Sequence, residues 1–497
     1  MQSKRIFTRL LLLFILALGI YSFVFRERND TPKTGSFEDW AKYMGKKIPG
    51  LMADHDIPGL IIAFIQDGKT VWIDSYGYAD LENKIPMTID TRCRVESISK
   101  SVTAWGVMKL VTEGKIDLEK TLASYLKTWS LPESLYSEEK VTIRQLLNHN
   151  SGMPLGTLDA LYDPEDELPS LREFLKSDAI LFQEPGISYS YSNVGYNLLE
   201  LLIEEVTERD FAQYMSDEIL DPLGMYDSSF TWSHTWKPEI PKGYDINGRA
   251  VPVYIYPNKA SGGLFSTAGD IASFVSAGMK KHDLQEQRVL NGEAIGEIYN
   301  STVKLTGYYS QVFDGYSFGH FIETLDDGTF TVSNGGQGSG WMSYFQSVPE
   351  TGNGIVMLSN SQRSWPLFSS ILTDWSGWSG IPSVGMSVIK RMSAVLRISL
   401  AILYFITLAG MILTVISLRR GKRQFFFVKK AFRGSQLVQI TLSVMLTAVV
   451  TAVSQMKYFF LNSVFPVETP WLAGLVLAVA GLLFFLAMVP QKLSNVR

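Results

Sequence analysis

The sequence predicts a mixed α/β domain, in which an antiparallel sheet is flanked by helices and carries an inserted helical subdomain, joined to transmembrane helices. Strand-like patterns cluster at both ends of residues 37–385, helical periodicities fill the middle, and long apolar stretches lie outside this region. Strands from both ends of a segment can pair into one sheet while the helices between them pack against it. A catalytic cleft is then expected between the sheet and the helical subdomain.

Two hairpins give the clearest strand signals. Residues 60–75 contain two strand-like runs around an Asp-Gly pair at 67–68, and residues 320–333 contain two around an Asp-Gly pair at 327–328. Asp-Gly between such runs predicts a tight turn, because both turn positions need a positive φ. Further strands are expected at 341–348 and 355–358.

Helices are expected between these strands, where apolar side chains recur every three or four residues. The helix expected at 97–113 is apolar along most of its length, which indicates burial. The expected helices are 97–113, 142–147, 170–177, 196–207 and 211–219.

The N-terminus has the layout of a membrane signal. An uncharged apolar run at 10–25 follows Lys4, Arg5 and Arg9, which is typical of a signal peptide or a signal anchor. No small-x-small cleavage motif follows, so we expect residues 1–26 to form a transmembrane anchor, with a removed signal peptide as the alternative. The polar, turn-rich residues 27–36 would form a tether.

Three further spans are expected within residues 395–490. The uncharged stretches 398–418, 435–456 and 471–489 each approach the ~20 residues that a helix needs to cross hydrocarbon. The loop 419–434 contains seven basic and no acidic residues, and such loops face the cytoplasm. Four alternating spans then place the large domain outside the cell; buried core helices are the alternative interpretation.

Charge and composition exclude several classes of partner. The formal charge is −4, and leaving out +7 in the basic loop, +3 in residues 1–9 and +2 in residues 491–497 gives −16 for the rest. Nucleic acid is therefore not an expected partner. Cys93 is the single cysteine, so we expect a small buried hydrophobic residue and no intramolecular disulfide. The five histidines are scattered, so we expect no metal and no cofactor.

Ser97 and Lys100 are the first candidate catalytic residues. Their Ser-x-x-Lys spacing at the start of a helix places hydroxyl and amine on one helix face. A serine hydroxyl becomes a good nucleophile when a neighbouring base takes its proton, and a desolvated lysine amine can act as that base. Five other Ser-x-x-Lys pairs occur in the chain, so Ser97 is distinguished by its position at a long buried helix. An ordinary N-cap serine is the alternative.

Tyr191 and Asn193 form the second candidate element. They lie after a Pro-Gly turn and before an expected helix, and in an extended loop residues two apart point the same way. A tyrosine there can transfer protons if Lys100 lowers its pKa, and the amide can orient the lysine and a substrate carbonyl. The alternative is a core tyrosine followed by an N-capping asparagine.

The third element is the glycine-rich run at 334–341, between two expected strands. Glycines allow a ligand to approach a strand edge closely. We expect Asn334, Gly336 and Gln337 to bind substrate, with the backbone N–H groups of Gln337 and Ser97 facing an oxyanion. An ordinary Gly-rich hairpin loop is the alternative.

In this order, the three motifs resemble the serine beta-lactamase and DD-peptidase superfamily, in its class C beta-lactamase-related branch. The resemblance covers about residues 37–362 and implies a beta-lactamase/transpeptidase-like fold. The four-span arrangement is similar to that of flp-type proteins, penicillin-binding-protein-like relatives in Gram-positive bacteria. Supporting phrases lie at 113–118, 146–154, 184–186, 221–225 and 262–267.

The resemblance implies an acyl-enzyme mechanism in which Ser97 attacks a carbonyl, Lys100 and Tyr191 handle protons, and Asn193 positions substrate. Family members usually carry His-x-Gly or Lys-Thr-Gly on the Gly-rich strand, where this chain has Asn334, Gly335 and Gly336. The cation that would bind a substrate carboxylate is therefore missing, and with it a charge-assisted bond of ~1.5–3 kcal/mol.

We therefore expect a membrane-embedded serine hydrolase at the cell surface, acting on cell-wall-related or small acyl substrates such as esters or D-amino-acid amides. The alternatives are a catalytically weak or inactive wall-binding relative of penicillin-binding proteins, and a beta-lactamase. The sequence does not determine the physiological substrate or the oligomeric state.

Overall fold

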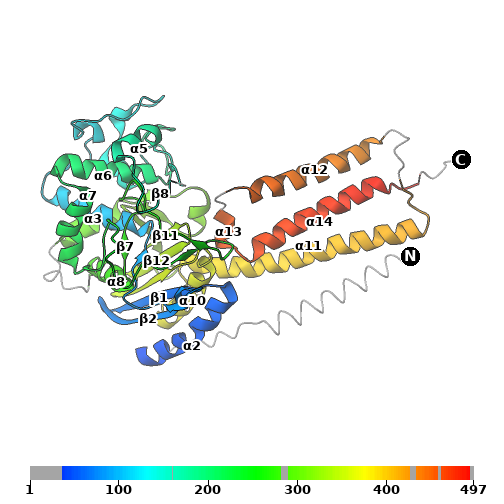
Figure 1. Cartoon of the computed structure of the whole chain (residues 1–497), viewed down its shortest axis with the longest axis horizontal. Coiled ribbons are helices and arrows are strands. Elements are labelled where there is room, and N and C mark those ends of the chain that lie inside the picture. The colour runs from blue at the N-terminus through cyan, green and yellow to red at the C-terminus, as the bar shows by residue number, and fades with distance from the viewer. Residues whose placement is uncertain (1–35, 159, 281–288, 426–431, 457–459, 493–497) are drawn as a thin grey trace. The chain divides into compact units, whose positions relative to one another are not determined.

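The structure, a computed structural model, describes residues 36–158, 160–280, 289–425, 432–456 and 460–492 (Figure 1). The chain divides into a large compact unit, Thr31–Val388, and a second unit that contains Ile389–Arg497. The expected N-terminal anchor at 1–26 and all of the expected tether except Ser36 lie outside the described residues.

A nine-stranded antiparallel sheet forms the centre of the large unit (Figure 1). Its first long strand, β1 (Gly59–Gln66), pairs with its last, β13 (Asn353–Ser359), and Leu60 lies opposite Ser359. The prediction of one sheet built from both ends of the domain is therefore confirmed. The other strands are β2 (Lys69–Asp80), β3 (Ile85–Pro86), β8 (Val303–Lys304), β9 (Gly315–Ser317), β10 (His320–Thr324), β11 (Phe330–Gly338) and β12 (Trp341–Val348), in the order β3-β2-β1-β13-β12-β11-β10-β9-β8.

Both Asp-Gly hairpins form where they were expected. Asp67 and Gly68 connect β1 to β2 with φ of +51° and +75°. The connection between β10 and β11 is longer than the predicted tight turn: it spans residues 325–329, and within it Gly328 has a φ of +87° while Asp327 has no positive φ. Positive φ at Asp67 and Gly68 gives the turn a twist that matches the twist of the paired strands. Two small two-stranded sheets also form, β4 (Cys93–Arg94) with β7 (Phe265–Ser266) and β5 (Gly243–Tyr244) with β6 (Ala250–Val251).

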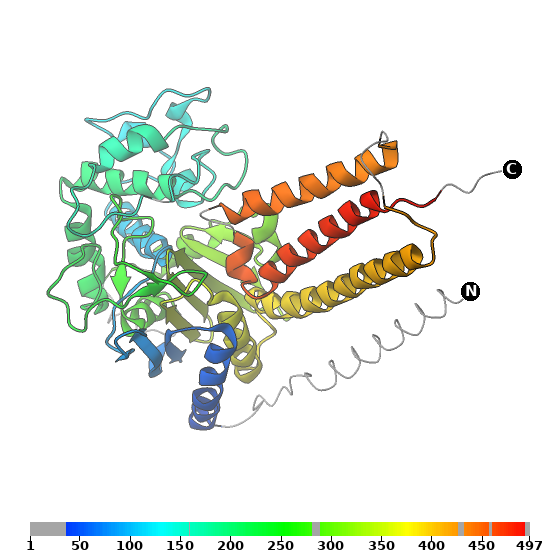
Figure 2. The same cartoon turned by 45° about the vertical axis from the view of Figure 1, so that its right-hand side comes forward.

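The central sheet is covered on both faces. Side chains alternate along β1, so Ile61, Ala63 and Ile65 lie in the main apolar core while Phe64 points to the other face. There the Phe64 ring lies 4.3 Å from the ring of Trp40. Fully burying a side chain of this size contributes about 1.5–3 kcal/mol. The covering helices are α2 (Phe37–His55) and α10 (Trp365–Ser379) on the Phe64 side, and α8 (Ala268–Ala277) on the core side, where it contacts β1, β2 and β13 (Figure 2).

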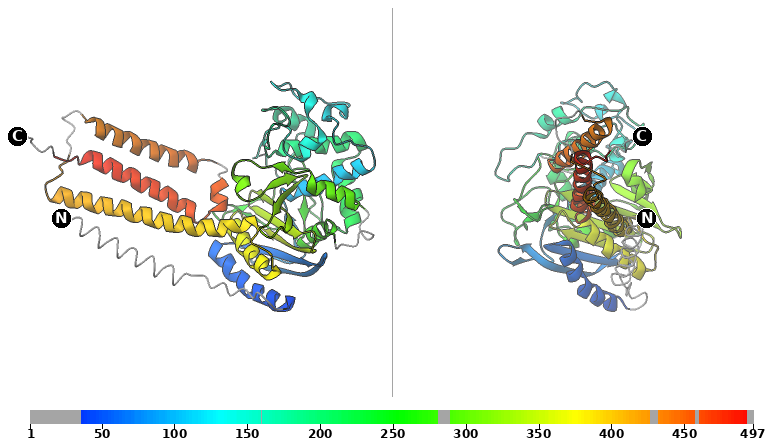
Figure 3. Two further views of the ribbon diagram at one scale, coloured as in Figure 1. Left: turned by 180° about the vertical axis from the view of Figure 1, so that it is seen from behind. Right: turned by 90° about the vertical axis from the view of Figure 1, so that its right-hand side faces the viewer.

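A helical subdomain is inserted between the strands, as predicted (Figure 3). Its centre is α6 (Asn193–Thr207), which is buried along most of its length and contacts four other helices. The helix expected at 211–219 ends earlier, because the chain passes into a π-helical turn at Ser216–Leu220. The other helices are α3 (Ile98–Thr112), α4 (Ile143–Leu147), α5 (Leu171–Asp178), α7 (Phe211–Met215) and, further on, α9 (Gly292–Asn300).

Within the described residues, the second unit contains three helices that are long and apolar enough to cross a membrane. They occupy the three stretches where spans were expected. Arg397 pairs with Glu468 at 2.6 Å, and the Tyr404 hydroxyl donates to Trp471 O at 2.7 Å, so the first and last of these helices are joined by polar contacts. The helices are α11 (Val388–Arg419), α12 (Gly434–Ser454) and α14 (Glu468–Met488), with a short α13 (Phe460–Val464) before the last.

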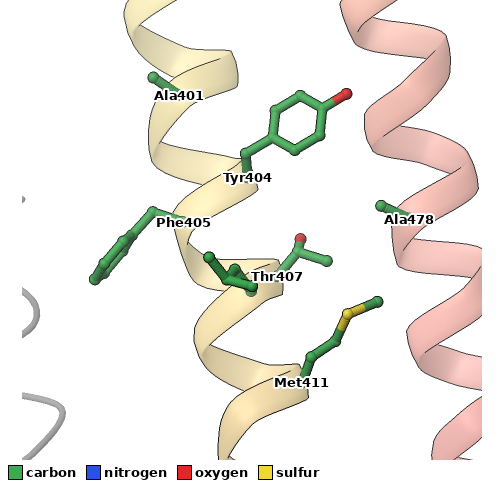
Figure 4. A pocket seen from close by; sticks show the side chains of 7 residues that line it. Ala401, Tyr404, Phe405, Thr407, Met411 and Ala478 are labelled. Carbon is green, nitrogen blue, oxygen red and sulfur yellow. The ribbon is translucent and has the colours of Figure 1, made fainter.

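An apolar groove of about 400 Å³ lies along α11 (Figure 4). Ala478 of α14 faces it from the other side, and Thr407 contributes a small polar group. A groove of this composition is compatible with a position in hydrocarbon. It is lined by Ala401, Tyr404, Phe405, Thr407, Leu408, Met411 and Ala478.

Candidate active site

Ser97 lies at the entrance to α3, as the motif predicted. Among the described residues its side chain makes no capping bond to the helix backbone, so the N-cap alternative does not account for it. Instead the hydroxyl lies 3.1 Å from Lys100 Nζ, one turn along the helix. Hydroxyl and amine are therefore within hydrogen-bonding reach, which is the geometry that a nucleophile and its base require.

Lys100 is completely buried. Its Nζ donates to Ser261 O at 2.6 Å and lies 4.9 Å from the centre of the Tyr191 ring and 5.8 Å from that of Tyr196. Burial lowers the pKa of this amine to about 7, while the negative charge of Glu96 opposes the shift. A large share of Lys100 is therefore neutral at physiological pH and able to accept a proton.

Tyr191 is brought to Lys100 by the loop before α6. The N-cap of this helix is Ser192, whose Oγ accepts from Gly195 N at 2.9 Å. Asn193 is therefore the first residue of the helix and not its cap, and its backbone N–H donates to Leu155 O at 3.1 Å. Tyr191 therefore lies next to Lys100 just before α6, and Asn193 is the first residue of that helix. Their proton-transfer and positioning roles remain predictions.

His149 lies behind Tyr191 in an aromatic cluster. Its ring centre is 4.4 Å from that of Tyr191 and 4.7 Å from that of Tyr316. Its Nδ1 accepts from Ser192 N at 3.1 Å. Burial and the nearby charge of Lys100 hold the pKa of His149 well below its usual value, so the ring is neutral and supports the Tyr191 loop.

Asn334, which we expected to bind substrate, contacts several groups of the protein itself. It is buried, and its Nδ2 lies 3.0 Å from Ser97 O, 2.9 Å from Ser101 Oγ and 2.9 Å from Gly319 O. Its Oδ1 accepts from Gly335 N at 2.8 Å. The whole amide is used inside the protein, where it ties β11 to the start of α3. Side chains of even-numbered residues in this part of β11 point toward α3. We therefore assign Asn334 a positioning role.

Gly336 and Gln337 follow the same alternation. A Cβ at Gly336 would overlap Val95 O, which shows that β11 lies directly against the residues before Ser97. Gln337 points the other way, and its Oε1 accepts from Trp365 Nε1 of α10 at 2.8 Å. The expected oxyanion contact concerns the backbone N–H of Gln337, and it stays a prediction.

The loop 259–264 contacts the candidate site through Ser261, which was not among the predicted site residues, although the adjoining residues 262–267 form one of the supporting phrases. It supplies Ser261 O to Lys100. Glu200 of α6 fixes this loop by accepting from Lys259 N at 2.6 Å and Ala260 N at 2.8 Å, and Thr103 Oγ1 donates to Ala260 O at 3.0 Å. Any residue can supply a backbone carbonyl, so the contact between Ser261 O and Lys100 is identified only by the position of this loop beside α3.

Comparisons with known proteins agree with this geometry. A family model described as beta-lactamase matches residues 44–370. The chain belongs to the beta-lactamase family. Within this family, protein flp of Staphylococcus aureus strain MW2 is 30% identical over 203 residues, which cover 40% of each chain. A D-aminopeptidase of Brucella anthropi is 34% identical over 176 residues, 34% of this chain and 32% of that protein. The chain thus matches less than half of either relative.

A solved member of the fold is the octameric penicillin-binding protein homologue from Pyrococcus abyssi. It superposes with a TM-score of 0.61 and 27% identity over 71% of this chain and 81% of that one. The relatives that the chain matches include a hydrolase, the D-aminopeptidase.

Proposed function

We propose that the protein is a membrane-anchored, cell-surface hydrolase that uses Ser97 to attack esters or D-amino-acid amides related to the cell wall. The observation that carries this proposal is the 3.1 Å separation between Ser97 Oγ and the buried Lys100 Nζ. The three apolar helices support anchoring. Similarity to a D-aminopeptidase supports a D-amino-acid amide as one substrate class.

In the proposed reaction, the neutral Lys100 amine takes the proton of Ser97 while Oγ attacks the substrate carbonyl. The backbone N–H groups of Ser97 and Gln337 stabilise the oxyanion. Tyr191 then donates its hydroxyl proton to the leaving group as the bond to the acyl carbon breaks, and the Lys100 ammonium returns a proton to Tyr191. A water molecule next attacks the acyl group, with Tyr191 and Lys100 taking its proton and returning one to Ser97 Oγ as the acid leaves. These groups lie at the start of α3, on β11 and in the loop just before α6.

The position of Asn334 bears on the substrate. Its side chain is a neutral amide, so it offers no cation for a substrate carboxylate, and its two N–H groups already face three acceptors in the protein. Loss of such a charge-assisted bond disfavours classical beta-lactams and D-alanyl-D-alanine peptides relative to substrates without a carboxylate. Esters and primary amides are therefore favoured over a beta-lactamase activity.

A fluorophosphonate probe tests the nucleophile. We expect peptide mass analysis of the full chain in detergent micelles to find the probe on Ser97, and Ser97→Ala to remove it. Ser124→Ala is the matched control, because Ser124 and Lys127 have the same spacing on the surface of the domain. An unlabelled wild type would instead support the wall-binding alternative.

Substrate class is tested next with paired chromogenic compounds. We expect turnover of p-nitrophenyl acetate and of D-alanine p-nitroanilide, with much slower turnover of the L-alanine compound. Hydrolysis of a chromogenic cephalosporin at a higher kcat/KM than either would contradict the proposed substrate class.

A further inference from the structure

Glu96, the residue directly before Ser97, has an unusual backbone. Its φ is +50°, a left-handed conformation that residues other than glycine rarely adopt. It is also buried, which is uncommon for a carboxylate without partners. Conformational strain at such a position persists only where the surrounding structure holds it, and it concentrates at functional sites.

Three donors hold the Glu96 carboxylate. Oε1 accepts from Arg94 Nε and from the Tyr254 hydroxyl, each at 2.9 Å, and Oε2 accepts from the Tyr256 hydroxyl at 2.9 Å. The other side is closed by β11, because a Cβ at Gly338 would overlap the carboxylate. The three hydrogen bonds and the contact with β11 therefore fix the position of the Glu96 carboxylate.

Arg94 extends this network to the loop that contacts Lys100. Its remaining nitrogens donate to Tyr254 O at 2.8 Å and to Gly262 O at 3.3 Å. Gly262 is the neighbour of Ser261, whose carbonyl accepts from Lys100. Glu96 and Arg94 thus link the turn that precedes Ser97 to the loop 259–264, which contacts Lys100.

The charge of Glu96 also acts on Lys100. The groups around this amine are the Ser97 hydroxyl, Ser261 O, the rings of Tyr191 and Tyr196, and the neutral His149. Glu96 is the acidic residue whose charge raises the pKa of Lys100 against the effect of burial. Without this charge, the ammonium form would lose its favourable electrostatic interaction in a site that already disfavours it.

We propose that Glu96 is a positioning residue that holds the strained turn before Ser97 and supplies the buried negative charge that balances the ammonium form of Lys100. This inference rests on the proposed function, because it assigns Glu96 a role through Ser97 and Lys100. It adds a group outside the three motifs, which acts through charge as well as through geometry.

The test is the pH dependence of probe labelling at Ser97 in the full chain, compared with thermal stability. We expect Glu96→Gln to move the acidic limb of the labelling rate to lower pH by about one unit. We expect Glu96→Asp, which keeps the charge on a shorter side chain, to leave the limb in place and to lower the rate about tenfold. Glu205→Gln is the matched control, because Glu205 is a buried, ion-paired glutamate held by Arg172 and Thr128. It should leave the limb unchanged.

An unchanged acidic limb in Glu96→Gln, with only a lower Tm, would overturn the charge role. If Glu96→Gln does not fold, Glu96→Asp decides, and a wild-type rate in that variant would overturn the positioning role. If the wild type itself is not labelled, the proposed function fails instead. In that case the titration of Lys100 is followed by 13C NMR in the wild type and in Glu96→Gln, with the Lys100 signal assigned by its loss in Lys100→Arg. Equal titration midpoints of Lys100 in the two proteins would overturn the inference.

Discussion

Lys100 shows how burial of a single residue changes its chemistry. An exposed lysine is almost entirely protonated at neutral pH and cannot act as a base. In the interior the charged form loses solvation, and the pKa falls to about 7. The 3.1 Å contact with Ser97 then couples this available base to the hydroxyl.

The first prediction concerns pH. The ammonium form dominates below the pKa and cannot accept a proton, so labelling of Ser97 should fall as pH decreases, with half the maximal rate at about pH 7. Lys100→Met should reduce the rate about 100-fold or more. Lys109→Met, on the same helix but paired with Glu113, should leave it near the wild-type value. A labelling rate independent of pH would contradict the assignment of Lys100 as base.

The second prediction concerns Asn334. Asn334→Ala removes the donor shared by Ser97 O, Ser101 Oγ and Gly319 O, and leaves these buried acceptors without it. The free energy of unfolding should fall by about 1–3 kcal/mol, measured by chemical denaturation. Asn247→Ala, at an exposed turn, should change it by less than about 0.5 kcal/mol. A neutral Asn334→Ala would return Asn334 to the role of a substrate contact.

At the scale of elements, the site depends on how closely β11 approaches the start of α3. Residues 334–338 continue the strand and do not form a loop. Successive residues of this segment face opposite sides of the sheet. Asn334 and Gly336 face the residues around Ser97, whereas Gln337 faces α10. Gly336 and Gly338 serve the protein's own packing, since Val95 O and the side chain of Glu96 occupy the space that a side chain at these positions would need.

The third prediction follows from this packing. Gly336→Ala would force a methyl group against Val95 O and Ser343 Oγ and displace the turn that carries Ser97. We expect a loss of stability of about 1–3 kcal/mol and a loss of Ser97 labelling. Gly377→Ala in α10 is the control, because no atom lies within 4 Å of the added Cβ. It should be neutral or stabilising, since alanine favours helix by about 1 kcal/mol. Equal Tm values for the two variants would argue against the close approach.

At the scale of the whole molecule, the chain combines a compact unit, which holds the candidate active site, with a second unit that contains apolar helices. The large unit holds the sheet, the helical subdomain and every candidate site residue. The buried Cys93 is the single cysteine, and burial raises the pKa of its thiol to about 12. The native thiol should therefore be inert to maleimides, which makes introduced cysteines specific reporters.

The fourth prediction tests the orientation in the membrane. Asp326→Cys, in the β10–β11 hairpin, should react with a membrane-impermeant maleimide in intact cells. Lys422→Cys, in the basic loop, should react only after the membrane is opened. The unmodified chain should give no signal in either condition. Reaction of Lys422→Cys in intact cells would contradict a cytoplasmic loop and an external domain.

By itself, the sequence determined the elements and much of their arrangement. Apolar periodicity, the two Asp-Gly turns and the three long apolar stretches are local signals, so they predicted the hairpins, the helices and the antiparallel sheet. Ser97 and Lys100 are one helical turn apart, so their proximity was also predictable from spacing.

Only the tertiary structure decided what acts on those residues. Ser261 is 161 positions from Lys100 and Tyr254 is 158 from Glu96, and contacts at such separations depend on how the whole core packs. Any residue can supply a backbone carbonyl, so such a contact has no sequence motif. The effect of a buried charge depends on the exclusion of solvent, which a sequence motif does not show either. For the same reason the sequence did not show the contacts of the Asn334 amide with Ser97 O and Gly319 O, which depend on the pleat of β11 and the approach of α3.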